Sequence, residues 1–151
     1  MPQNGDDSIA GKYRFNDIEV DPRNLYLDPN NLRTLLTETD IKEYTGDQIT
    51  SERLQAKLYD LLLKNPGNKI IELAESIKND GWVDEGGFFV KPINNSNKYL
   101  VKEGNRRTCA VKYLLAKPSQ LTPRVLSSLK SIPAKIIEVF DKKNERRIER
   151  I

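Results

Sequence analysis

A short strand-like run, a glycine and a helical repeat follow one another in residues 99–115, and this order constrains the fold most. Tyr99, Leu100 and Val101 are β-type residues, and Gly104 stands just before an amphipathic helical pattern. Glycine at such a turn allows a left-handed or crowded backbone that other residues avoid. The segment therefore predicts a strand that passes through a tight turn directly into a helix.

The rest of the sequence alternates the same two element types and indicates an α+β fold. We expect strands at 18–20 and 132–139, a hairpin from 88–90 and 99–101, and helices at about 50–65, 69–79 and 123–129. Residues 21–31 are dense in Asp, Pro and Asn and predict turns and extended chain. Thr50 and Thr122 are the expected N-caps of the first and the last of these helices.

Composition excludes several classes of function. The 151 residues suffice for one domain with its own core. Histidine is absent and Cys109 is the single cysteine, which excludes histidine-based catalysis, a His/Cys zinc site and an internal disulfide. We expect no haem, flavin, zinc or NAD. The apolar runs are too short to cross a membrane and the polar N-terminus has no secretory signal, so a cytoplasmic protein is expected.

Charge is informative mainly through its distribution. The net charge of +3, from 25 basic and 22 acidic residues, is too small to indicate nucleic-acid binding by itself. Residues 141–151 hold five basic residues against three acidic ones. We predict that Asp141 caps a basic helix cut off at residue 151, which either is a solvated surface or is a segment that meets phosphate or begins a further domain. Residues 1–16 are expected to form a flexible N-terminal arm.

Two arginines occupy an unusual position at the start of the helix that follows Gly104. Arg106 and Arg107 fall in its first turn, where the helix dipole disfavours cations by a few tenths of a kcal/mol to about 1 kcal/mol. A bound anion would offset this cost, and phosphate suits it best because its oxygens match the guanidinium fork. The alternative is that both arginines pair with carboxylates such as Glu103 or Asp84.

Several segments stand in an order that is typical of one superfamily. A proline-rich turn closes on Arg33, a Leu-Ala-Glu-Ser-Ile helix at 73–77 leads to Gly81, and a strand ends in Lys-Pro at 91–92. A Gly-Asn-Arg-Arg box at 104–107 then opens a helix with alanine close behind. In this order, over about residues 17–140, the chain resembles the N-terminal domain of the ParB and sulfiredoxin superfamily.

The resemblance implies a small mixed β-sheet flanked by helices over residues 17–140, with a helical insertion at about 34–68. It implies a nucleoside triphosphate bound with Mg²⁺; in ParB proteins this is CTP, whose binding closes a DNA clamp. The residues expected to contact the nucleotide phosphates are Gly104, Asn105, Arg106, Arg107, Thr108 and Arg33. The carboxylates expected near Mg²⁺ are Glu103, Asp84 and Glu85.

Departures from the family pattern leave parts of this hypothesis open. Asn105 replaces the commoner glutamate of the box, and residues 82–87 are longer than the corresponding link in the family. The sequence therefore leaves open whether the bound nucleotide is CTP, ATP or GTP and whether the domain hydrolyses it slowly. It also leaves open whether the domain forms a homodimer. We expect the domain to belong to a larger DNA-associated protein of segregation, regulation or defence, with the DNA contacts outside this chain.

Two other functions compete with nucleotide binding. Sulfiredoxin chemistry needs a cysteine inside the glycine box, where this chain has Asn105, while Cys109 falls in a run typical of burial. This activity is disfavoured. A ligand-free interaction module would use Trp82, Phe88 and Phe89 as its partner surface, although an aromatic strand is more often core.

Overall fold

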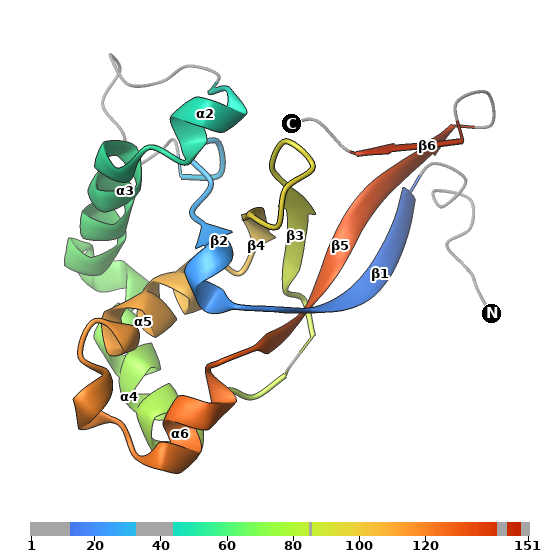
Figure 1. Ribbon diagram of the computed structural model, residues 1–151. Coiled ribbons are helices and arrows are strands. Elements are labelled where there is room, and N and C mark those ends of the chain that lie inside the picture. Colours follow the sequence, from blue (N-terminus) through green and yellow to red (C-terminus); the bar gives the residue numbers. More distant parts are fainter. Residues whose placement is uncertain (1–12, 33–43, 85, 142–144, 149–151) are drawn as a thin grey trace.

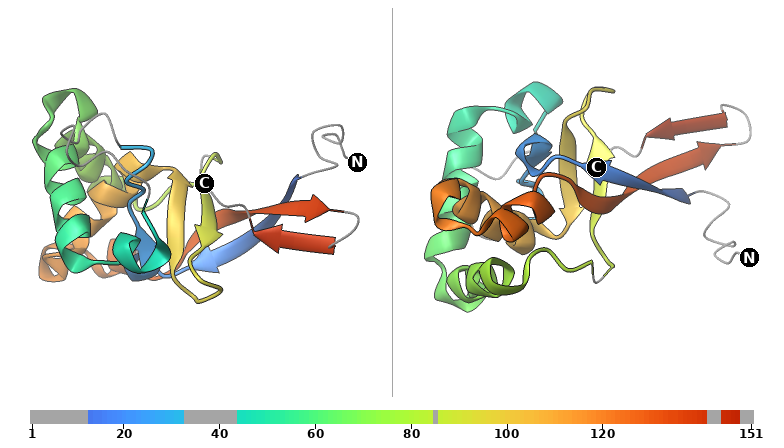
Figure 2. Two further views of the ribbon diagram at one scale, coloured as in Figure 1. Left: turned by 90° about the horizontal axis from the view of Figure 1, so that it is seen from above. Right: turned by 60° about the horizontal axis from the view of Figure 1, so that its bottom comes forward.

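The computed structural model describes residues 13–32, 44–84, 86–141 and 145–148 and confirms an α+β fold. Figure 1 shows the helices gathered at one side, next to the short strands β2 and β4, while β1, β5 and β6 extend to the other. The two further views in Figure 2 agree that this long ribbon leads away from the helices. None of the described helices combines the length and the apolar character that crossing a membrane requires.

One mixed sheet, six-stranded within the described residues, holds all the strands. Its strands are β1 (Tyr13–Val20), β2 (Leu25–Tyr26), β3 (Phe89–Pro92), β4 (Tyr99–Glu103), β5 (Ile132–Asp141) and β6 (Glu145–Ile148). The order is β1-β5-β3-β4-β2, and β6 also pairs with β5. The pairs β1/β5, β3/β4 and β5/β6 are antiparallel, whereas β2/β4 and β3/β5 are parallel. The predicted hairpin from 88–90 and 99–101 is therefore confirmed as the β3/β4 pair.

The helices follow the predicted apolar repeats closely. They are α2 (Gly46–Ile49), α3 (Glu52–Lys64), α4 (Ile70–Asp80), α5 (Asn105–Leu115) and α6 (Pro123–Ser128), with single 3-10 turns at η1 (Pro22–Asn24), η4 (Pro66–Asn68) and η5 (Pro118–Gln120). The Thr122 side chain accepts from Val125 N and caps α6, as predicted. The prediction for α3 is wrong by one residue, because Ser51 is its cap and Thr50 ends α2.

The core has two main parts that meet at one aromatic side chain. Helices α3, α4, α5 and α6 bury their apolar faces against one another. Strand residues such as Val90, Val101 and Ile132 form a second cluster with Phe88. Trp82 packs against both clusters, so the segment that joins α4 to β3 also joins the helical layer to the sheet.

The described part of the predicted insertion, residues 44–68, is helical and belongs to the core. Leu58 and Leu62 of α3 are fully buried in the helical cluster, and Ile49 of α2 packs with Ile93 and Leu100. Residues 33–43 lie outside the described residues. The segment is therefore an integral layer of the domain, since removing it would uncover the apolar sides of α4 and α5.

The first strand is longer than the sequence pattern predicts. β1 begins at Tyr13, which pairs with Val139, and runs to Val20, which pairs with Ile132. The predicted flexible arm at 1–16 therefore overlaps the strand by four residues, and residues 1–12 lie outside the described part. Pairing with β5 explains the difference, because a partner strand holds even a polar segment in extended form.

The predicted basic helix at 141–151 is wrong where the structure describes it. Residues 145–148 form the strand β6, with Asp141 pairing with Glu145 and Glu138 with Ile148. β3 pairs with β5 only at Lys135 and Ile136, so beyond them this edge of β5 offers backbone groups that another strand can satisfy. This hairpin pairing outweighs a local helix signal that has few residues to propagate it.

Candidate functional site

The turn between β4 and α5 has a shape that only glycine fits. Gly104 has φ 115°, in the left-handed region, and it stands at the N-cap position of α5. A Cβ added there would overlap the Phe88 ring. The left-handed backbone and the close contact with Phe88 thus both require glycine at this position. The fold alone therefore explains the glycine of the predicted box, without a ligand.

The N-terminus of α5 keeps its backbone amides unpaired within the helix. No side chain caps it, and its first intrahelical bond runs from Thr108 N to Gly104 O at 2.9 Å. The amides of residues 105–107 therefore have no intrahelical acceptor. Together with the positive end of the helix dipole, these amides favour an anion.

The side chains of Arg106 and Arg107 both donate to backbone carbonyls. Arg106 Nε donates to Asn68 O at 2.9 Å, and an Arg107 terminal nitrogen donates to Gly86 O at 3.1 Å. Among the described residues, neither guanidinium makes an ion pair with a carboxylate, so the expected alternative of pairs with Glu103 or Asp84 is wrong for this structure. Two positive charges at the helix start thus keep their capacity for an anion.

Arg107 rests on an aromatic surface that fixes its direction. Its Cζ lies 5.0 Å from the ring centroid of Trp82 and 5.3 Å from that of Phe88. The two rings are nearly perpendicular, at 79° with centroids 5.5 Å apart. Such cation–π contacts stabilise by about 0.5–1 kcal/mol at exposed sites. The sequence pattern favours these aromatics as core or as a partner surface and gives no signal of their contact with Arg107.

Asn105 and Thr108 use their side chains inside the protein. Asn105 is 8% exposed; its Oδ1 accepts from Asp28 N at 3.0 Å and its Nδ2 donates to Val101 O at 3.0 Å. Thr108 is 1% exposed and its hydroxyl donates to Gly104 O. The side chain of Asn105 therefore holds the turn in place through these two hydrogen bonds. Its backbone amide belongs to the open helix N-terminus.

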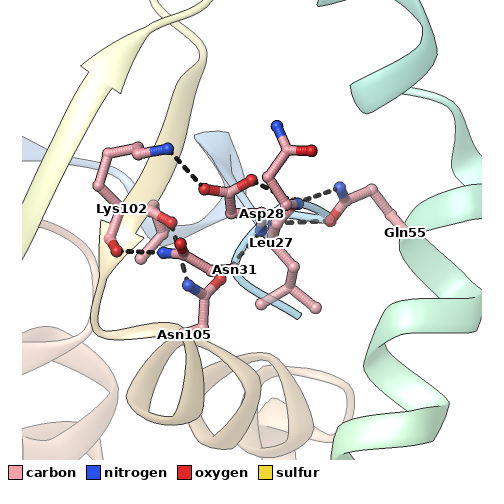
Figure 3. Close-up of polar contacts among 8 residues, drawn as sticks. Leu27, Asp28, Asn31, Gln55, Lys102 and Asn105 are labelled. Carbon is pink, nitrogen blue, oxygen red and sulfur yellow. Dashed lines mark hydrogen bonds and ion pairs between the residues drawn. The ribbon is translucent and has the colours of Figure 1, made fainter. Parts of the chain in front are cut away.

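A buried ion pair lies next to this turn and was not predicted. Lys102 Nζ lies 2.8 Å from Asp28 Oδ2, and the two side chains are 9% and 0% exposed. Figure 3 shows Asp28 between Lys102 on one side and Gln55 of α3 on the other, with Asn105 at the start of the helix below. The nearby Asn31 side chain donates to Lys102 O. Sequence patterns gave no signal for it, because Asp28 stands in a stretch whose polar residues are typical of exposed turns.

Gln55 connects helix α3 to the same cluster. Its Oε1 accepts from Leu27 N at 2.8 Å, and its Nε2 donates to Leu27 O and to Ile49 O, both at 2.9 Å. The side-chain amide thus acts like a neighbouring backbone strand for Leu27. As a result, α3 holds the segment 27–31 against the β4–α5 turn.

The other predicted contacts are only partly described. Arg33 and Glu85 lie outside the described residues. Asp84 Oδ1 accepts from Gly86 N at 3.1 Å, and Glu103 is exposed at the end of β4. Across the residues that the structure describes, no three acidic or thiol side chains gather as metal ligands would. The Mg²⁺ ligands stay a prediction.

A cavity of ≈ 660 Å³ opens beside the Gly86–Gly87 loop. Asp17, Glu19 and Asp84 line it, together with Lys135, whose Nζ is 2.6 Å from Asp17 Oδ1. With three carboxylates against one ammonium, this space disfavours phosphate but can accept hydroxyl donors or a cation. Gly86 contributes to its wall and also binds Arg107, so the cavity and the arginine share one loop.

Cys109 is buried, as its apolar sequence surroundings predict. It is 0% exposed, and burial raises the pKa of its thiol to about 12. Its Sγ approaches Tyr59 O at 3.8 Å, inside the helical core. The thiolate needed for nucleophilic attack is therefore scarce at neutral pH.

Comparison with known proteins leaves the function to be argued from the site itself. Neither family models, nor curated proteins, nor solved structures gave a match.

Gly104→Ala is expected to destabilise the protein by about 2–4 kcal/mol, because it adds left-handed strain to the overlap with Phe88. Gly86→Ala is the matched control: Gly86 has φ 74° but nothing within 4 Å of an added Cβ. It should lose only about 1 kcal/mol. Urea unfolding of both variants measures the difference, and equal losses would show that the Phe88 contact is unimportant.

Lys102→Met is expected to lower the free energy of unfolding by about 3–5 kcal/mol, because it leaves Asp28 charged and buried. Adding Asp28→Asn should restore part of this loss, since a neutral amide needs no counter-ion. Lys64→Met is the control, because Lys64 is 76% exposed in its pair with Asp60. It should cost less than about 1 kcal/mol. A double variant as unstable as Lys102→Met would argue against the ion-pair explanation.

Cys109 should react with a thiol reagent such as DTNB only when the protein unfolds. At pH 8 the native thiol remains almost wholly protonated because its pKa is raised to about 12, whereas an unfolded cysteine near its ordinary pKa forms thiolate readily. The measurement compares the rate in buffer with the rate in urea. Fast reaction of the native protein would contradict the burial and reopen thiol chemistry.

Proposed function

We propose that this domain binds a nucleoside triphosphate, with the phosphates at the N-terminus of α5. One observation carries the proposal: two arginines occupy the first turn of a helix whose N-terminus has no cap, and neither pairs with a carboxylate among the described residues. Each arginine opposes the helix dipole, and a polyanion would reverse that cost. The resemblance to ParB-type domains supports the same site.

The two arginines suit two different tasks. Arg107 is held in place by Trp82 and Phe88, so little side-chain entropy remains to be lost when it meets a phosphate. Arg106 is exposed, and among the described residues its side chain bonds one carbonyl, that of Asn68, so it can turn toward a ligand. The backbone amides of residues 105–107 add neutral donors between these charges.

The remainder of the nucleotide is proposed to extend toward the acidic cavity beside Gly86 and Gly87. Carboxylates there can accept hydrogen bonds from sugar hydroxyls or hold Mg²⁺ through oxygen, and Asp84 lies closest in sequence to the loop that Arg107 contacts. The identity of the base and slow hydrolysis of the nucleotide are open questions at this site. That the domain belongs to a DNA-associated protein and that it forms a homodimer remain predictions.

Two alternatives have less support. Sulfiredoxin-like chemistry is disfavoured because Asn105 stands at the cysteine position of the box and Cys109 is buried. A ligand-free interaction module would use Trp82, Phe88 and Phe89, but Trp82 and Phe88 pack against the core clusters, and Phe89 is half-buried beside the exposed Phe15. Measuring nucleotide binding distinguishes a nucleotide-binding domain from an interaction module that binds no ligand.

The test begins with thermal shifts in CTP, ATP and GTP, each with and without Mg²⁺. A nucleotide at about 100 times its Kd should add about 2.7 kcal/mol of stability. Arg106→Gln is then expected to weaken binding about ten-fold or more in calorimetric titration, because a charged hydrogen bond contributes roughly 1.5–3 kcal/mol. The unfolding temperature of this variant should change little, since Arg106 is exposed.

Arg53→Gln is the matched control, because Arg53 is an exposed arginine in the first turn of α3, outside the site. Arg107→Gln should weaken binding similarly, but it should also lower the unfolding temperature through lost contact with Trp82. If no nucleotide shifts the wild type, or if Arg106→Gln binds as tightly as Arg53→Gln, the proposed phosphate site is refuted.

A further inference from the structure

A second, smaller cleft lies in the helical layer, away from the start of α5. It has a volume of ≈ 210 Å³ and is lined by residues of α3, α4, α5 and η5 and the segments that flank η5. Figure 1 shows α3, α4 and α5 side by side at this place, and each of these helices contacts the other two. The nucleotide proposal does not use this cleft.

The floor and walls of the cleft suit one flat ring. Leu114 and Leu121, which are 6% and 8% exposed, form part of the helical core beneath it. Tyr59 and Tyr113 line the cleft from α3 and α5. A dry cavity of roughly 150 Å³ is enough for benzene. The cleft therefore has room for an aromatic ring with one small substituent, but it is below the usual size of a nucleotide pocket.

The polar groups at the rim favour a negatively charged substituent. Lys78 of α4 and Lys117 at the end of α5 stand against the single carboxylate of Glu75. Among the described residues, neither ammonium group makes an ion pair. Burial raises the pKa of Tyr59, so its hydroxyl stays protonated at neutral pH and can donate. Two ammonium groups and a hydroxyl donor at the rim thus favour an anion, and one carboxylate, that of Glu75, opposes it.

The geometry points to a binding site for a small aromatic carboxylate: the ring lies between Tyr59 and Tyr113 over Leu114, and the carboxylate meets Lys78 and Lys117. The negative dipole at a helix C-terminus is by itself a sufficient reason for a lysine there. It does not explain why two tyrosines and two buried leucines line the same cleft. Aromatic side walls around an apolar floor with a few polar groups are typical of small-molecule sites.

Benzoate is the probe, and amide shifts in two-dimensional NMR spectra of the 15N-labelled chain are the readout. We expect shifts confined to α3, α4, α5 and η5, with a Kd on the order of 1 mM for so small a ligand. Benzamide, which keeps the ring but has no charge, should bind about five-fold more weakly, as should benzoate to the Lys78→Gln/Lys117→Gln variant. That variant should bind benzamide as the wild type does.

Lys64→Gln and Lys130→Gln, which alter exposed lysines outside the cleft, are the controls and should bind benzoate as the wild type does. Ala116→Phe, at an exposed position on the rim, should block the cleft and abolish the shifts without unfolding the chain. The proposal is overturned if benzoate causes no shifts up to about 10 mM, ten times the expected Kd. Shifts at other residues, or equal affinity of benzoate and benzamide, overturn it as well.

Discussion

The buried ion pair between Asp28 and Lys102 is the contact on which the arrangement around the β4–α5 turn depends. Removing two charges from water costs several kcal/mol per ion, and the cost is offset only when every remaining polar group is paired. Here Asp28 accepts from Lys102 Nζ and from Asn30 N, and its own amide donates to Asn105. Because these partners come from the loop at 28–30 and from the end of β4 and the start of α5, the charge joins two stretches of sequence that are distant from each other.

Through this cluster helix α3 supports the candidate phosphate site. Gln55 of α3 holds Leu27, the residue after Leu27 binds Asn105, and Asn105 is the first residue of α5. The turn that presents the open amides is therefore fixed from one side by α3 and from the other by the contact of Gly104 with Phe88. A turn held in this way is preorganised, which lowers the entropic cost of binding.

Local sequence signals predicted the elements that local physics determines. The strand–glycine–helix order at 99–115 and the Thr122 cap of α6 depend on neighbours within a few residues, and both are present. The predicted helix after Asp141 failed because residues 145–148 turn back and pair with the preceding strand β5 as a hairpin, which the mixed charge pattern of this segment does not indicate. The Asp28–Lys102 pair was missed for a different reason: the two residues are 74 positions apart, beyond the reach of local patterns.

The positively charged residues of α5 differ in whether the fold alone explains their positions. Lys112 in its last turn accords with the negative end of the helix dipole, so it has a reason within the fold. Arg106 and Arg107 oppose the positive end, but Arg107 gains the faces of Trp82 and Phe88 in return. Arg106 gains one exposed hydrogen bond to Asn68 O, whose net contribution of about 1 kcal/mol is no larger than the cost of its position. The fold alone accounts for Arg107, whereas Arg106 is better explained by an anion.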